Sequence, residues 1–321
     1  MKINFIPFLF AFCLCAVPTF AQDAADSSAT EESAPEPNWK KGAILGLNFS
    51  QTYLDNWQGG GQNAINGTVI LNGFLNYKKG KLSWENSFDA AYGLTRIGEK
   101  GQVQKTDDRV EVNSKLGVKS PVPNTFWTAM FTFRTQWDAG YDYSQTPPSL
   151  ISDPFAPAYI ISGLGIDYKP GDKFSAYISP ITNKTTIVDN QRLADQGAFG
   201  VEGATYNDAG MKLTDGEMIR YEIGGMLKLS YVTELVKNVK LNTKADLFSN
   251  YLNNPQNIDI NWETLIAMKI NSWLTTSIST HVIYDDDITF AVDRDGDGVN
   301  DGRGPRTQLK EVFALGIQIQ L

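Results

Sequence analysis

Hydrophobic and polar residues alternate one by one through most of the chain from Trp39 onward. In the first such stretch, Leu45, Leu47 and Phe49 alternate with Gly46 and Asn48. A period of two is that of a β-strand, whose successive side chains point to opposite faces, and no window of useful length repeats with the helical period. The pattern predicts twelve strands, at 42–54, 64–78, 81–96, 107–119, 125–138, 158–169, 173–181, 217–231, 238–251, 258–270, 273–284 and 308–321.

The predicted connections differ in length in a regular way. Every second one is a short turn, such as Lys79-Gly80, and most of the others are longer loops, of which 182–216 is the longest and 252–257 the exception. An even number of strands with short turns at one end and long loops at the other is typical of outer-membrane barrels. We therefore expect an all-β fold, a transmembrane antiparallel up-and-down β-barrel of about twelve strands, over residues 39–321.

Charged and aromatic residues favour a membrane barrel over a soluble sandwich, which would also alternate. The apolar face carries almost no charge, Glu311 being the exception. The polar face, which would line the lumen, holds charges of both signs, neither of which dominates: Glu85, Asp89, Arg109, Glu111, Lys115, Arg134, Arg220, Glu222, Lys228, Lys240, Lys244, Asp246, Asp259, Glu263 and Lys269. Two belts of Tyr and Trp are expected on the apolar face, near the two ends of the strands, as at two membrane–water interfaces.

The first residues resemble a secretory signal. A basic start, an apolar run from Ile3 to Val17 and small residues before the cleavage point predict a signal peptide at 1–21, cleaved after Ala21. Cys13 and Cys15 lie inside it, so the mature chain would have no cysteine for disulfides, thiol catalysis or metal binding. Residues 22–38 contain no aliphatic residue larger than Ala and are expected to form a disordered periplasmic leader.

Location and partners follow from these features. The signal peptide and the barrel pattern predict the outer membrane of a Gram-negative bacterium, with outer-membrane lipid around the apolar face. The last strand alternates up to Leu321, and we expect it to pair with the first strand and to be recognised by the outer-membrane assembly machinery. The formal charge of −8, or −9 after removal of Lys2 with the signal, shows no attraction to nucleic acid. The oligomeric state stays open.

Four blocks carry a family resemblance. They are Leu54-Asp55-Asn56-Trp57-Gln58-Gly59-Gly60-Gly61, Phe155-Ala156-Pro157-Ala158-Tyr159, Ser179-Pro180-Ile181-Thr182-Asn183-Lys184-Thr185-Thr186 and Leu193-Ala194-Asp195-Gln196-Gly197-Ala198-Phe199-Gly200-Val201. With them the chain resembles, from about residue 40 to its end, an uncharacterised family of Bacteroidota outer-membrane β-barrels. The resemblance implies fold and location and carries no activity.

A cation-binding motif lies in the last predicted loop. Asp293, Asp295 and Asp297 alternate along the chain, followed by Gly298 and Asp301. Carboxylates at such spacing can surround a hard cation that takes six to eight oxygen ligands. The spacing resembles thrombospondin type 3 turns more than an EF-hand, because Gly304 stands where an EF-hand has Glu. We expect Asp293, Asp295, Asp297 and Asp301 to bind calcium weakly, with a structural role; a solvated acidic turn is the alternative.

Catalysis is not expected. His281 is the only histidine, and Ser279 shares its strand face, as in some outer-membrane phospholipases, whose pair faces lipid. Here the neighbouring Ile278 and Val282 occupy the apolar face, so His281 is predicted to point into the lumen, and no orienting acid is evident. The sequence thus predicts a protein that is not an enzyme. Its function is expected to be that of a small-solute channel or ligand-binding barrel, with a non-conducting structural or accessory barrel of an envelope assembly as the alternative.

Overall fold

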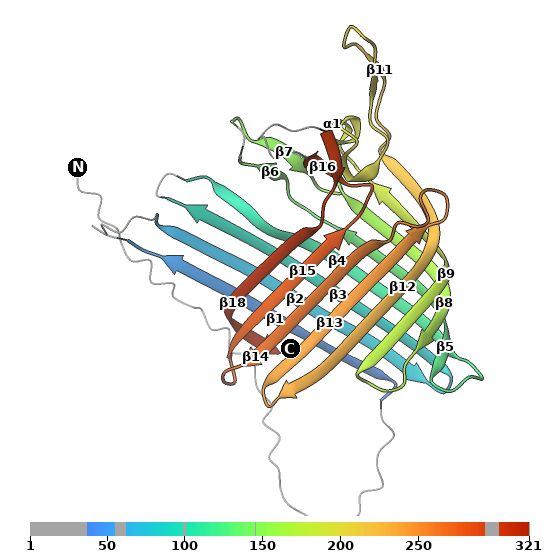
Figure 1. The fold of residues 1–321 in the computed structure, drawn as a ribbon. Coiled ribbons are helices and arrows are strands. Elements are labelled where there is room, and N and C mark those ends of the chain that lie inside the picture. The colour runs from blue at the N-terminus through green and yellow to red at the C-terminus, as the bar shows by residue number, and fades with distance from the viewer. Residues whose placement is uncertain (1–36, 55–61, 99–100, 145, 293–301, 321) are drawn as a thin grey trace, which may run out of the picture. The chain divides into compact units, whose positions relative to one another are not determined.

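The described part of the chain is a closed antiparallel β-barrel. A computed structural model describes residues 37–54, 62–98, 101–144, 146–292 and 302–320. Twelve strands form the ring in the order β1-β18-β15-β14-β13-β12-β9-β8-β5-β4-β3-β2, so each strand pairs with its neighbours along the chain and the last pairs with the first (Figure 1). The predicted signal peptide and nearly all of the leader, like the blocks around Trp57 and Asp293, lie outside the described residues.

All twelve predicted strands are confirmed as the strands of the ring. They are β1 (Trp39–Thr52), β2 (Ala64–Lys79), β3 (Leu82–Ile97), β4 (Val103–Lys119), β5 (Thr125–Thr135), β8 (Ala158–Tyr168), β9 (Phe174–Ile187), β12 (Ile219–Val236), β13 (Val239–Asn250), β14 (Asp259–Lys269), β15 (Leu274–Tyr284) and β18 (Gln308–Gln320). The connection between β3 and β4, expected to be long, spans only 98–102, because β4 begins earlier than its alternation suggested.

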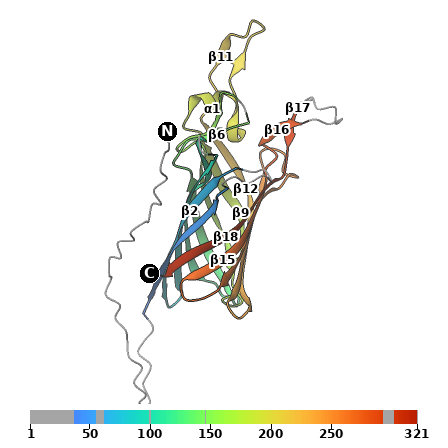
Figure 2. The ribbon, with the colours of Figure 1, turned by 90° about the vertical axis from the view of Figure 1, so that its left-hand side faces the viewer.

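Short turns lie at one end of the barrel and most longer loops at the other; we call these the turn end and the loop end. The turn from β2 to β3 needs Gly80 at φ +59°, and that from β12 to β13 places Asn238 at φ +67°. Both residue types tolerate positive φ at low cost. Small elements lie in the connections of the loop end, and Figures 1 and 2 place α1, β6 and β11 there. These elements are β6 (Gly140–Asp142), β7 (Ser149–Ser152), α1 (Gln191–Asp195), the 3-10 turn Ala198–Gly200, β10 (Thr205–Tyr206), β11 (Lys212–Thr214), β16 (Thr289–Val292) and β17 (Gly302–Pro305).

The outer face is apolar and exposed. Large hydrophobic side chains such as Phe131, Leu164, Ile181 and Phe313 are exposed on it. Exposed aromatic rings gather near both strand ends, as predicted: Trp39, Trp84, Trp127, Tyr168 and Tyr231 at the turn end, and Tyr53, Trp137, Tyr221, Tyr251 and Trp262 at the loop end. A band of this kind suits a hydrocarbon layer between two aqueous interfaces.

A bulge in β9 changes which residues face the lumen. Ser179 and Thr182 oppose Met226 and Gly224 of β12, so three steps along β9 match two along β12. Before the bulge Tyr177 and Ser179 are buried, and after it Thr182, Lys184 and Thr186 are buried, whereas Ile178 and Ile181 are exposed outside. The inward positions therefore switch from odd to even numbers at Pro180. The predicted strand ended at 181 because alternation breaks there, and the loop predicted at 182–216 begins only after Ile187.

The ring closes through its shortest pairing. Among the described residues, β1 and β18 are matched over five residue pairs, from Ile44↔Gln320 to Asn48↔Gly316. By contrast, β1 and β2 are matched over their full length, from Trp39↔Tyr77 to Thr52↔Ala64. Among the described residues, the seam thus joins only the middle of β1 to β18.

Candidate functional site: the lumen

A buried ion-pair layer lies in the lumen near the loop end. Lys184 of β9 places its Nζ 2.7 Å from Asp259 Oδ2 of β14, 3.4 Å from Asp285 Oδ2 and 3.5 Å from Glu222 Oε2 of β12. Lys184 is 8% exposed and Glu222 1%. The layer links non-adjacent strands, since β12 and β13 separate β9 from β14 in the ring. We call these four residues the loop-end layer.

Arg220 extends this layer into the loops. Its Nη1 donates to the carbonyl of Gly200 at 2.9 Å, and its Nη2 forms an ion pair with Asp287. One guanidinium therefore ties β12 to two different connections, the one before it and the one between β15 and β18. Planar guanidinium groups suit such divergent contacts because they carry five donors in fixed directions.

The long connections at the loop end have an apolar core of their own, which we call the cap. Its buried residues are Ala156, Val188, Leu193, Ala194 and Val201, from the connections 136–157 and 188–218. Asn190 joins the two: its side-chain oxygen caps α1, accepting from the N–H groups of Arg192 and Leu193, and its Nδ2 donates to Asp153 at 2.7 Å. The cap is therefore a packed element rather than a pair of independent loops.

A second layer, the middle layer, crosses the lumen closer to its centre. Arg109 of β4 reaches Glu263 of β14, with Nη1 3.0 Å from Oε1, and six positions separate these strands in the ring of twelve, so the pair spans opposite walls. Beside it, Arg134 Nε lies 2.6 Å from Glu111 Oε2. Unlike the loop-end layer, the crossing pair is hydrated, with side chains 31% and 30% exposed.

His281 belongs to the middle layer, as its predicted lumen-facing position required. The Asn261 amide nitrogen donates to His281 Nε2 (2.6 Å), which orients the amide oxygen to accept from Arg134 Nη2 (3.0 Å). Glu263 Oε1 lies 3.7 Å from the same imidazole nitrogen. The predicted lumen-facing position of His281 is confirmed, and its contacts with Asn261 and Glu263 make it part of the middle layer.

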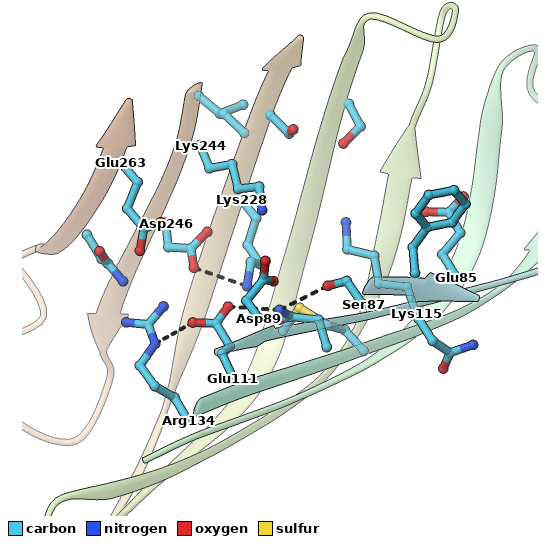
Figure 3. Close-up of a pocket in the computed structure, with 18 of the residues that line it drawn as sticks. Glu85, Ser87, Asp89, Glu111, Lys115, Arg134, Lys228, Lys244, Asp246 and Glu263 are labelled. Carbon is cyan, nitrogen blue, oxygen red and sulfur yellow. Dashed lines mark hydrogen bonds and ion pairs between the residues drawn. The ribbon is translucent and has the colours of Figure 1, made fainter. Parts of the chain in front are cut away.

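A cavity of about 300 Å³ lies in the lumen against the middle layer and toward the turn end (Figure 3). Its lining carries five cationic side chains, Arg109, Lys115, Arg134, Lys228 and Lys244, and five carboxylates, Glu85, Asp89, Glu111, Asp246 and Glu263. The prediction that neither sign dominates is thus confirmed for this cavity. Such a lining suits a neutral or dipolar solute better than a strongly charged one.

One side of the lumen is filled by apolar residues. Met130, Tyr177, Met226 and Phe248 pack together on the inner faces of β5, β9, β12 and β13. Lysine side chains lie against this cluster, with Lys115 Nζ 5.1 Å from the centre of the Tyr177 ring and Lys184 Nζ 5.2 Å from that of Phe248. Cation–π contacts of this kind hold ammonium groups beside apolar surface. The free space is therefore confined to the rest of the lumen cross-section.

The sequence anticipated many of these residues but missed two of the most buried. The sequence pattern places Lys184 in a loop, because the bulge at Pro180 interrupts the alternation, whereas the structure places it in β9. Asp167, 1% exposed and 3.2 Å from Lys115 Nζ, belongs to the lumen face of β8 but was not singled out. The alternation could have identified Asp167, because its neighbours Ile166 and Tyr168 lie on the apolar face and a carboxylate between them must face the lumen.

The predicted calcium ligands Asp293, Asp295, Asp297 and Asp301 lie outside the described residues, so that site stays a prediction. Among the residues that the structure does describe, Asp259, Asp285 and Asp286 form a different acidic group, with carboxylate oxygens within 4.8 Å of one another. This group could bind a metal ion. However, the Lys184 ammonium already neutralises two of its members, Asp259 and Asp285, and would compete with a cation there.

Comparison with known proteins yields one family. The model described as "Protein of unknown function (DUF3078)" matches residues 49–141, less than a third of the chain. The match bears out, over these residues, the predicted resemblance to a family of unknown function. The assignment to Bacteroidota and the extension of the resemblance to the end of the chain stay predictions. No curated protein sequence matches the chain.

Solved structures with similar folds are outer-membrane proteins with very different sequences. The COG4313 outer membrane channel from Pseudomonas putida F1 is 9% identical, with 92% of this chain and 99% of that chain covered and a TM-score of 0.35. The translocator domain of the autotransporter NalP from Neisseria meningitidis is 8% identical, with 87% and 86% covered and a TM-score of 0.35. The P. putida toluene transporter TodX is 8% identical, with 89% and 90% covered and a TM-score of 0.29. None of the described helices is long and apolar enough to cross a bilayer.

Proposed function

We propose that this protein is an outer-membrane channel for small polar solutes. The observation that carries the proposal is the Arg109–Glu263 pair, which joins opposite walls directly beside a cavity lined with charges of both signs. A solvated ion pair contributes about 1 kcal/mol or less. Separating Arg109 from Glu263 therefore costs little free energy. Once the two side chains are apart, the cavity would extend toward the loop end.

The proposed location is the outer membrane of a Gram-negative bacterium. It is supported by the exposed apolar outer face and by the aromatic rings at both strand ends. Lipid would contact this face, and the assembly machinery would recognise the last strand, whose outward residues include Leu315, Ile317 and Ile319. We assign His281 to the middle layer of the lumen and propose no catalytic role for it.

Planar-bilayer recording tests the channel. We expect small, brief openings from the wild-type barrel and at least a several-fold longer open time from Arg109→Gln, because Glu263 then loses its partner on the opposite wall. Lys240→Gln is the matched control: Lys240 lies outside the cavity lining, four residues before Lys244 on β13, and its loss should leave the openings unchanged. Correctly folded wild-type and Arg109→Gln barrels that both stay silent would refute the channel.

A second candidate, a non-conducting accessory barrel, is favoured by the cap. The buried residues of the cap come from two connections and pack as one apolar cluster, and Lys184 and Glu222 of the loop-end layer are buried. In that case the loops would serve an envelope assembly, and silent recordings from both barrels would favour this candidate.

A further inference from the structure

The charges of the lumen cavity are nearly all matched by ion pairs. Of the ten charged side chains in its lining, eight have a partner of opposite sign within 4 Å. Six of these pair within the lining: Arg109 with Glu263, Arg134 with Glu111, and Lys228 with Asp246. Glu85 and Lys115 pair with Lys169 and Asp167, which lie outside it.

The two remaining charges are opposite in sign. Among the described residues, neither Asp89 nor Lys244 forms an ion pair. Asp89 Oδ1 accepts a hydrogen bond from Asn72 Nδ2, which leaves Oδ2 without a side-chain partner in the described part of the barrel. Lys244 is exposed to the lumen. An unmatched carboxylate and an unmatched ammonium therefore line one small cavity.

These two side chains project from opposite walls at a similar depth. Asp89 is on β3 and Lys244 on β13, and six positions separate these strands in the ring. Asp89 lies directly across the strand pair from Glu111, and Lys244 directly across from Glu263. Since both neighbours belong to the middle layer, Asp89 and Lys244 flank the same layer from two sides (Figure 3).

We propose that Asp89 and Lys244 bind the two ends of a small zwitterion, a molecule with an ammonium group at one end and a carboxylate at the other. The ammonium end would donate to Asp89 Oδ2 and the carboxylate end would accept from Lys244 Nζ. A simple anion would be attracted by Lys244 but repelled by the unpaired Asp89. A simple cation would be attracted by Asp89 but repelled by the unpaired Lys244. This inference deepens the proposed function by naming its solute class, yet it concerns binding and can be measured without conductance.

Calorimetric titration of the purified barrel in detergent tests the site. The probes are ω-amino acids of increasing chain length, each compared with its N-acetyl derivative, which keeps only the carboxylate, and its amide, which keeps only the ammonium. We expect one chain length to bind at least about tenfold more tightly than both derivatives, equivalent to about 1.4 kcal/mol.

Two variants separate the ends. Asp89→Asn should abolish the preference for the zwitterion over the N-acetyl derivative, and Lys244→Gln the preference over the amide. Lys240→Gln on the same strand should change neither. Heat-modifiable migration on gels shows that each variant is folded.

The outcomes distinguish this inference from the channel itself. Equal binding of zwitterion and derivatives, no binding at any chain length, or the same loss in Lys240→Gln would overturn the inference even if the barrel conducts. A tenfold preference in a barrel that stays silent in bilayers would support the inference and refute the channel.

Discussion

The two polar layers of the lumen differ in burial and in the number of partners. Lys184 contacts three carboxylates and is nearly inaccessible, whereas Arg109 and Glu263 face one another in a hydrated space. Removing one partner of a buried ion pair leaves an uncompensated charge and costs about 3–5 kcal/mol, while a solvated pair contributes about 1 kcal/mol or less. We therefore expect the loop-end layer to fix the structure of the mouth and the middle layer to rearrange at lower cost.

The largest expected effect breaks the loop-end layer. Lys184→Met leaves Asp259 and Asp285 without an ion-pair partner among the described residues, while Glu222 keeps only Arg220 at 3.3 Å. The substitution should destabilise this end of the barrel by about 3–5 kcal/mol. Limited proteolysis should show faster cleavage in 285–307, and gel migration should show unfolding at lower temperature. Lys240→Met, which removes a lysine with no ion pair among the described residues, is the control. Unchanged cleavage in Lys184→Met would show that the loops are held by other contacts.

The second effect asks whether the cap adds to this rigidity. Leu193→Ala opens a space in the apolar core of the cap, where Leu193 is 1% exposed, and substitutions of this type cost about 2–5 kcal/mol. Hydrogen exchange should accelerate in 188–203 and in 149–157 together, because the two segments share that core, while the barrel strands stay protected. Leu213→Ala, at an exposed site in β11, should change neither. Acceleration in only one segment would contradict a shared core.

The third prediction applies to the middle layer and expects a small change in stability. Arg109→Gln should shift the thermal unfolding of the barrel by an amount equivalent to about 1 kcal/mol or less, since Glu263 stays hydrated and retains His281 nearby. A loss as large as that of Lys184→Met would erase the distinction between the two layers.

The smallest effect is a pH dependence outside the barrel. A hydrogen bond from Lys212 to Asp195, together with one from the backbone N–H of Gly216, lowers the pKa of Asp195 from 3.8 to about 2. Because this pKa is depressed in the folded state, the contact contributes fully above pH 3.8 and is lost as the pH falls toward 2. Hydrogen exchange in 205–216 should therefore accelerate below pH 3.8, and Asp195→Asn should remove that dependence. A profile that is unchanged by the substitution would refute the assignment.

The strands could be predicted from the sequence because a barrel in a membrane leaves a two-residue period along each of them. Lumen residues such as Arg109, Glu111 and Glu263 followed directly from that period. The ion pair between Lys184 and Asp259 could not be predicted in this way. Alternation gives the face on which a residue lies, but neither its depth in the barrel nor its partner on a distant strand. At Pro180 the bulge in β9 interrupts the two-residue period. For this reason the sequence pattern does not identify Lys184, which contacts three carboxylates, as a lumen residue.

The cap was beyond sequence reasoning for a different reason. Its core residues, among them Val188 and Leu193, come from two connections that are separated along the chain by β8 and β9. Short apolar stretches in loops have no period, so nothing in the sequence indicated that they pack on one another. The cavity charges were predicted individually, but which of them remain unmatched depends on side-chain distances.

The short seam between β1 and β18 has a consequence for the topology of the ring. Only Ile44–Asn48 of β1 have a register partner among the described residues of β18, so both Trp39–Ala43 and Phe49–Thr52 lie outside the described pairing. Backbone groups in hydrocarbon are costly to leave unbonded, and an edge that lacks a neighbour accepts another strand readily. If the barrel opens laterally or pairs with an additional strand, the seam between β1 and β18 is the place where the fewest hydrogen bonds must be broken.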